Sequence, residues 1–166
     1  MVNNQSINKT INCIIITVSD TRTIETDKSG QLIKQYIEEA GHSVINHQIV
    51  KDEMDEISEM INESLADERA SVILMTGGTG ISQRDVTIEV VERKFEKELP
   101  GFGEIFRMLS YTEDIGSAAM MSRAVAGVKG RQAIFAMPGS SGAVKLAMEK
   151  LILPELHHLV MELTKD

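Results

Sequence analysis

The amino-acid sequence predicts an α/β fold in which helices cover a mostly parallel sheet. Short apolar runs rich in β-branched residues alternate along the chain with segments whose apolar residues recur at helical spacing, and this alternation is typical of such a layered fold. The chain has 166 residues, of which 42% are hydrophobic and 25% are charged, as in ordinary globular proteins of one domain. We therefore expect residues 11–166 to form a single domain behind a flexible, polar N-terminus of residues 1–10.

The individual elements follow from the same patterns, taken in chain order. Strands are expected at residues 11–18, 44–50, 71–75, 125–128 and 132–137, and the short fourth run is expected at an edge of the sheet. Helices are expected at residues 29–40, 52–68, 85–99, 142–153 and from 154 onward, whereas residues 102–121 are expected to be helical or irregular. Asp52 and Asp85 are placed to cap two of these helices, Pro100 to break one, and Pro154 to begin the last.

The net charge of −8 is unevenly distributed along the chain. Residues 52–68 hold eight acidic residues and no basic one, in the pattern of an amphipathic helix with a solvated face, whereas residues 115–148 hold four basic residues and no acidic one. An acidic chain lacks the basic footprint that nucleic-acid binding needs, so we expect no nucleic-acid partner. No apolar run reaches the roughly 20 residues that span a bilayer and no signal peptide is visible, which predicts a cytoplasmic protein without membrane contact.

Cysteine and histidine usage argues against a metal centre built from these residue types. The single cysteine, Cys13, excludes an intramolecular disulfide and a multi-cysteine zinc site. His157 and His158 are adjacent on a helix and point in different directions. His42 and His47 lie five residues apart at a strand and are expected on opposite faces of the sheet.

Three loops at the expected carboxyl ends of strands could hold a ligand, because ligands of open α/β sheets bind at that edge. They span residues 19–23, 76–85 and 138–142, and the last two are rich in glycine and precede helices. Such loops present backbone N–H groups to phosphate oxygens, although glycine also serves tight turns. Known phosphate and nucleophile motifs do not fit: Gly80 is followed by Ile81 rather than Lys, and the segment from Gly139 lacks the final glycine of a nucleophile elbow.

Two acidic residues stand beside these loops. Asp52 follows the second expected strand, and nine residues separate Asp85 from the third expected strand. Each is a reasonable helix N-cap. Two carboxylates near phosphate loops are also what Mg²⁺-dependent phosphoryl or nucleotidyl transfer needs, because Mg²⁺ prefers carboxylate and phosphate oxygens. The two roles do not exclude each other.

At this point several spaced motifs resemble the molybdopterin-binding family over residues 11–160. The motifs are Thr76-Gly77-Gly78-Thr79-Gly80 with Asp85 beyond it, Pro138-Gly139-Ser140-Ser141-Gly142-Ala143, Leu153-Pro154-Glu155-Leu156-His157, and the opening Thr17-Val18-Ser19-Asp20. The segments Pro100-Gly101-Phe102-Gly103-Glu104 and Ser122-Arg123-Ala124-Val125-Ala126-Gly127-Val128 look most like the MoaB branch of that family, and less like its Mog branch or the gephyrin G domain.

The resemblance implies a three-layer α/β/α domain of molybdenum cofactor biosynthesis that binds molybdopterin. It further implies transfer of AMP from Mg-ATP to the terminal phosphate of molybdopterin, with a non-catalytic molybdopterin-binding protein as the alternative. Asp52 and Asp85 would hold Mg²⁺ or orient the phosphates. Ser19, Asp20 and the loop of Thr76, Gly77, Gly78, Thr79 and Gly80 would contact the nucleotide. The loop of Pro138, Gly139, Ser140, Ser141 and Gly142 would hold the pterin phosphate, with Arg123 or Lys145 adding positive charge.

The resemblance also implies self-association and further protein partners. Relatives form trimers or hexamers, so a homotrimer or homohexamer is expected, and other enzymes of cofactor synthesis are implied as partners. The apolar, methionine-bearing segment 102–121 is a candidate interface, and the alternative is that its apolar residues belong to the core.

Overall fold

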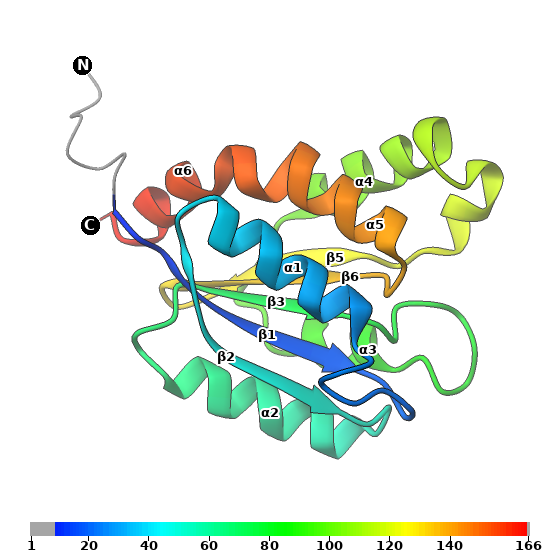
Figure 1. Cartoon of the computed structure of the whole chain (residues 1–166), viewed down its shortest axis with the longest axis horizontal. Helices are drawn as coiled ribbons and strands as arrows, with labels where there is room; N and C mark the ends of the chain where they lie inside the picture. The colour runs from blue at the N-terminus through cyan, green and yellow to red at the C-terminus, as the bar shows by residue number, and fades with distance from the viewer. Residues whose placement is uncertain (1–8, 166) are drawn as a thin grey trace.

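The computed structural model describes residues 9–165, and its centre is a six-stranded sheet in the order β2-β1-β3-β6-β5-β4 (Figure 1). Strands β2, β1, β3 and β6 run parallel, and β5 and β4 run antiparallel to their neighbours, which confirms the predicted mostly parallel sheet. The strands are β1 (Asn12–Val18), β2 (Ser43–Val50), β3 (Val72–Thr76), β4 (Lys97–Glu98), β5 (Val125–Lys129) and β6 (Gln132–Met137). Of the predicted N-terminal segment, residues 1–8 lie outside the described residues.

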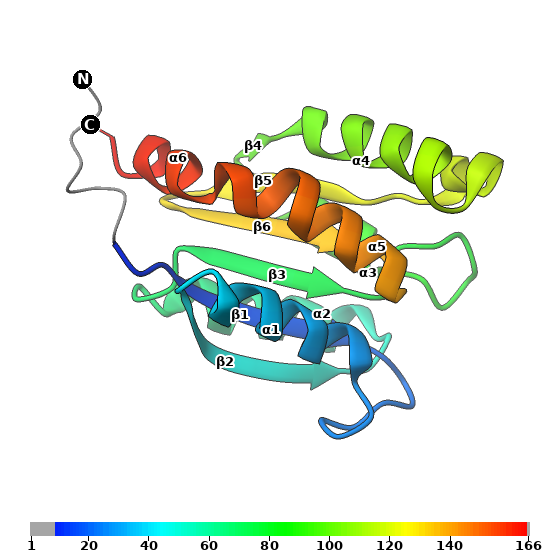
Figure 2. The same ribbon diagram turned by 45° about the horizontal axis from the view of Figure 1, so that its top comes forward.

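Helices cover both faces of this sheet and complete the three layers. They are α1 (Lys28–Glu39), α2 (Met54–Ala66), α3 (Thr87–Glu92), α4 (Pro100–Glu113), the 3-10 helix η1 (Gly116–Met121), α5 (Ser141–Leu146), the π-helical turn η2 (Ala147–Ile152) and α6 (Leu153–Leu163). Helices α1, α4, α5 and α6 pack on one face, and α2 and α3 pack on the other (Figure 2). None of the helices described is both long and apolar enough to cross a bilayer.

The side chains of the central strands alternate between two separate cores. Cys13 and Ile15 of β1 belong to the core under α1 and α6, whereas Ile14 and Ile16 belong to the core under α2 and α3. Successive strand residues point to opposite faces, so a strand covered on both sides needs an unbroken apolar run, which is what the sequence has here. Burial raises the pKa of the Cys13 thiol to about 12, so this thiol stays protonated and serves as a small apolar group.

The order of the strands reverses between the neighbours β1 and β3, and the region beyond the carboxyl ends of these two strands, called the crevice, is the switch point of the sheet. From β1 the chain continues to β2, which pairs with one edge of β1, and then to β3, which pairs with the other edge of β1. The connections that leave β1 and β3 therefore diverge, and open α/β sheets bind their ligands in the crevice at such a point. The loops after β1, β2, β3 and β6 all meet at this edge.

The helix predicted at residues 85–99 is wrong in its extent. Helix α3 ends at Glu92, and Lys97 and Glu98 form β4, which pairs with β5. The Phe95 ring packs over Gly127, where a Cβ atom would lie 2.3 Å from it. Pairing with β5 thus overrides local helical periodicity. As a result β5 is an inner strand rather than the predicted edge, and Pro100 begins α4 instead of only breaking a helix.

The predicted helix caps at Asp52 and Asp85 are also wrong. Helix α2 starts after Glu53 and helix α3 after Val86, and neither has a side-chain cap. The Asp85 carboxylate instead accepts hydrogen bonds from the backbone N–H and hydroxyl of Ser82, at 3.0 and 2.7 Å. Both carboxylates are therefore free of the helix role that sequence reasoning weighed against a ligand role.

Residues 141–163 form one continuous helical ribbon rather than two helices that meet at Pro154 (Figure 1). A proline inside an α-helix lacks its N–H and clashes with the carbonyl four residues earlier. The π-helical turn η2 immediately precedes α6 and relaxes the regular spacing there. The chain can therefore pass through Pro154 without a break.

Candidate active site

The loop after β3 is shaped by two glycines whose backbone other residues cannot adopt. Gly77 and Gly78 have φ angles of +96° and +70°, in the left-handed region that favours glycine. A Cβ atom on Gly77 would lie 2.3 Å from the backbone oxygen of Val18. Thr87 secures the loop from the helix side, because its hydroxyl donates to the Gly77 carbonyl at 2.9 Å and its N–H donates to the Gly78 carbonyl at 3.1 Å.

Both predicted acidic residues lie against this loop. A Cβ atom on Gly78 would lie 3.2 Å from Asp52 Oδ1, and one on Gly80 would lie 2.7 Å from Asp85 Oδ2. Burial raises the pKa of Asp52, and the charges of Asp20 and Asp85 raise it further. The two carboxylates thus share one electrostatic environment, as the sequence predicted from their positions after β2 and β3.

Asp20 belongs to the same cluster but is held by an arginine that the sequence analysis did not single out. Arg84 donates from Nε and Nη2 to the Asp20 carboxylate, at 3.1 and 2.9 Å, and from Nη1 to Glu53 Oε1 at 3.0 Å. The Asp52 backbone N–H also donates to Asp20 Oδ1, at 3.1 Å. The Arg84 guanidinium is the main reason why the pKa of Asp20 lies below its ordinary value. Ser19 shapes the preceding turn, since its hydroxyl oxygen accepts the backbone N–H groups of Thr21 and Arg22.

The loop after β6 lies beside the loop after β3. A Cβ atom on Gly139 would lie 3.6 Å from Gly77 Cα, and Thr76 Oγ1 donates to the Pro138 carbonyl at 3.2 Å. Thr76 is fully buried and joins the two loops, so it has no access to a ligand. Ser140 caps α5, accepting the Ala143 N–H at 3.2 Å.

The spatial distribution of charge around these loops differs from the distribution of charged residues along the sequence. Arg123 does not face the 138–142 loop: its guanidinium donates to the carbonyls of Gly80 and Asp85, at 2.9 and 3.0 Å, and pairs with Glu89. Asp114, from the end of α4, places its carboxylate 2.8 Å from where a Gly142 Cβ would lie. Lys145 remains exposed on α5. Residues 115–148 contain no acidic residue, but in the folded protein the Asp114 carboxylate lies against them.

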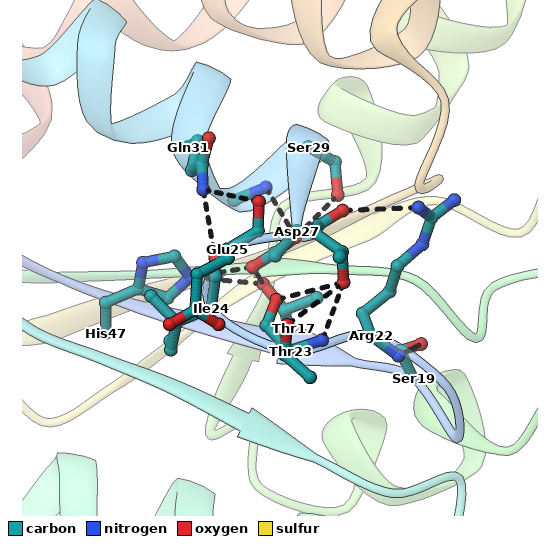
Figure 3. A network of polar contacts seen from close by, with 12 residues as sticks. Thr17, Ser19, Arg22, Thr23, Ile24, Glu25, Asp27, Ser29, Gln31 and His47 are labelled. Carbon is teal, nitrogen blue, oxygen red and sulfur yellow. Dashed lines mark hydrogen bonds and ion pairs between the residues drawn. The ribbon is translucent and has the colours of Figure 1, made fainter.

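A buried polar network holds the base of the 19–27 loop (Figure 3). Asp27, 1% exposed, is the N-cap of α1 and accepts the Gly30 N–H at 2.9 Å. Its Oδ2 accepts the Thr17 hydroxyl at 2.6 Å and lies 2.8 Å from His47 Nε2. Although burial acts in the opposite direction, hydrogen bonds from His47, Thr17 and Gly30 lower the pKa of Asp27. The network ties β1, β2 and α1 together next to the crevice.

The donor set of the crevice fits a divalent cation that arrives with a phosphorylated ligand. Within residues 9–165 no three His, Cys, Asp or Glu side chains form a metal cage. Mg²⁺ does not need one, since it is commonly held by one or two carboxylates, substrate phosphates and water. Asp52 and Asp85 would supply the carboxylates, and the glycine loop would allow close approach of phosphate to the backbone.

The structure thus brings together most of the residues that the sequence singled out. Asp20, Asp52, Asp85 and the 77–80 loop form one cluster, and the 138–142 loop adjoins it through Gly139. Sequence reasoning missed Arg84, Glu53 and Thr87. Only Thr87, a threonine next to an expected helix start, carried a local signal.

Comparison with known proteins identifies the family. Residues 14–158 match the family described as "Probable molybdopterin binding domain". Molybdenum cofactor biosynthesis protein B of Bacillus subtilis (strain 168) is 62% identical over 156 residues, covering 94% of this chain and 92% of that protein. A crystal structure of a molybdenum cofactor biosynthesis protein B has a TM-score of 0.93 at 55% identity, covering 96% of this chain and 99% of the other.

A more distant structural relative has the same fold. The tungsten cofactor synthesizing protein MoaB from Pyrococcus furiosus has a TM-score of 0.84 at 38% identity, with 95% of this chain and 99% of the other chain covered. The match with the family spans most of the chain, and the relatives are similar along nearly their whole length. The chain therefore belongs to the molybdopterin-binding family, in its MoaB branch, and has a role in molybdenum cofactor biosynthesis.

Proposed function

We propose that this chain binds molybdopterin and transfers AMP from Mg-ATP to its terminal phosphate, in the cytoplasm. The observation that supports this most directly is that Asp52 and Asp85 both lie against the glycine loop after β3, beside the loop after β6. Two carboxylates and two adjacent phosphate-type loops suit a reaction that joins two phosphorylated substrates.

In this reaction an oxygen of the molybdopterin phosphate attacks the α-phosphorus of ATP, and the bond from that phosphorus to the bridging oxygen breaks, releasing pyrophosphate. The work of the chain is to position both substrates and to compensate charge. The loop at Gly77–Gly80 supports the nucleotide phosphates, and the 139–142 loop supports the pterin phosphate. Asp52 and Asp85 would hold Mg²⁺, which neutralises the charge that develops on the leaving pyrophosphate.

A pyrophosphate-release assay with molybdopterin and Mg-ATP tests the proposal. Asp85→Asn keeps an oxygen for the Ser82 hydrogen bonds but loses the charge, and we expect it to lower the rate at least about 10²-fold. Asp67→Asn removes an acidic residue at the opposite edge of the sheet and serves as the control. An unchanged rate in Asp85→Asn would refute the assignment. If the wild type binds molybdopterin but releases no pyrophosphate, the alternative of a non-catalytic molybdopterin-binding protein is correct.

We also propose that the chain forms a homotrimer or homohexamer through α4 and η1. Large apolar side chains gather there with at least 45% exposure, namely Ile105, Met108, Tyr111, Ile115, Met120 and Met121, and patches of this kind mark interaction surfaces. Phe102 and Phe106 of the same segment are buried and belong to the core. Light scattering after gel filtration should show a trimer or hexamer that Met120→Lys dissociates and Met161→Lys, on α6, does not. A monomeric wild type would refute this interface.

A further inference from the structure

Arg84 connects three of the four loops that meet at the crevice, namely those after β1, β2 and β3. It lies in the loop after β3, and its guanidinium bonds Asp20, from the loop after β1, and Glu53, from the loop after β2. The Arg84 side chain is 56% exposed, and Asp20 and Glu53 are 37% and 55% exposed. All three groups can therefore exchange their partners for others without a burial penalty.

Acidic groups outnumber basic groups around Arg84, even though Lys51 acts on Asp20 and Arg123 pairs with Glu89 nearby. Asp20, Asp52, Glu53 and Asp85 supply four carboxylates to the crevice, and Arg84 is the guanidinium that bonds two of them. Arg84 thus serves as an internal counter-ion for carboxylates that would otherwise repel one another.

A bound Mg-nucleotide would change both sides of this balance. A divalent cation beside Asp52 and Asp85 would supply the positive charge that Arg84 now supplies. A triphosphate would supply oxygens that match a guanidinium as well as a carboxylate does, because both accept two parallel N–H donors. Residues 81–84 are all exposed, so Arg84 can turn without disturbing the core.

We propose that Arg84 is an exchangeable counter-ion of the nucleotide site: it binds Asp20 and Glu53 in the free chain and turns to the phosphates of the Mg-nucleotide when it binds. The inference rests on the proposed function in taking Mg-ATP as the ligand. It makes Arg84 a residue of the site that both suppresses binding of a bare cation and strengthens binding of the nucleotide complex.

The test measures two affinities in Arg84→Gln, using Mn²⁺ alone, counted by electron paramagnetic resonance, and Mg-ATP without acceptor, followed by calorimetry. Removal of a positive charge near the carboxylates should tighten Mn²⁺ binding about three- to tenfold. Loss of the phosphate contact should weaken Mg-ATP binding about tenfold. A merely structural role of Arg84 would weaken both together, so the opposite signs distinguish the two.

Two further variants sharpen the result. Arg84→Lys keeps the charge but loses the paired donors, and it should bind Mn²⁺ like the wild type while binding Mg-ATP less tightly. Arg69→Gln is the matched control, because Arg69 makes a similar two-bond contact with Asp67 far from the crevice, at 3.0 and 2.8 Å, and should change neither affinity.

Each outcome decides a specific part of the proposal. Unchanged or weaker Mn²⁺ binding in Arg84→Gln would refute the counter-ion role, and unchanged Mg-ATP binding would refute the exchange. If wild-type protein binds no Mg-ATP at all, the proposed function fails, and with it the exchange, whereas the Mn²⁺ titration still decides whether Arg84 is a counter-ion.

Discussion

Asp20 and Asp27 lie seven residues apart in the segment that follows β1, but one carboxylate is exposed and the other is buried. Asp27 is 1% exposed and satisfied by a hydroxyl, an imidazole and a backbone N–H from β1, β2 and α1. Asp20 is exposed and held mainly by one flexible guanidinium from a loop. The first arrangement fixes backbone segments relative to one another. The second can be dismantled at little cost, which is what a site that changes partners needs.

The largest effect should come from removing the buried carboxylate. Asp27→Ala removes the buried carboxylate that Thr17 and His47 both contact, and it removes the α1 cap. We expect it to lower the free energy of unfolding by about 3–5 kcal/mol, as for other broken buried pairs. Urea unfolding followed by circular dichroism measures this. Asp20→Ala is the matched control, and its unfolding midpoint should equal that of the wild type. Equal losses of stability in both variants would show that the buried and the exposed networks contribute alike to the fold.

A glycine substitution should disturb the buried network sterically. A Cβ atom on Gly30 would lie 2.1 Å from Asp27 Oδ2, 2.5 Å from His47 Nε2 and 2.7 Å from Thr17 Oγ1. Gly30→Ala should therefore destabilise the protein by about 1–3 kcal/mol, as overpacking does.

Gly101→Ala provides the comparison for Gly30→Ala. Gly101 also lies in the first turn of a helix, α4, and has no atom within 4 Å of its Cβ position. There alanine should be neutral or stabilise by up to about 1 kcal/mol, because it favours the helix. Thermal melting of the two variants checks both expectations, and a stable Gly30→Ala protein would mean that the network tolerates rearrangement.

Acid should weaken the buried network in a defined direction. Burial raises the pKa of Asp27, but hydrogen bonds from His47, Thr17 and Gly30 outweigh it and hold the pKa below the ordinary 3.8. A carboxyl with a depressed folded-state pKa adds stability above its unfolded-state pKa and loses it as the pH falls through the folded-state value. The stability advantage of the wild type over Asp27→Asn should thus shrink as the pH falls below about pH 4. Urea midpoints above and below this pH test it, and an advantage that grows in acid would contradict it.

The fold could be predicted where local pattern and tertiary structure agree. The inner parallel strands β1, β3 and β6 are buried on both faces, so their apolar runs mark them clearly, as at residues 13–18. The prediction failed at residues 93–99, where pairing with β5 and the packing of Phe95 on Gly127 decide the conformation. Nothing local to those residues reveals that partner.

The candidate site could likewise be predicted only in part. Glycine loops and acidic residues after strands can be read from the sequence because chain topology alone brings them to one edge. The contacts between them cannot: Arg84 and Asp20 are 64 positions apart, and Asp114 reaches the 138–142 loop only because α4 ends there. Arg123, expected to serve the pterin phosphate, instead supports the 80–89 segment.

The smallest effect on stability should come from the residue with the largest proposed effect on ligand affinity. Arg84→Gln removes the hydrogen bonds from the loop after β3 to Asp20 and Glu53, yet all three groups are exposed, and exposed ion pairs contribute little because water and salt replace them. We expect its urea midpoint to equal that of the wild type, at both low and high salt. A loss comparable with that of Asp27→Ala would show that Arg84 holds the fold together. An unchanged midpoint combined with altered Mn²⁺ and Mg-ATP affinities would show that Arg84 serves ligand binding rather than stability.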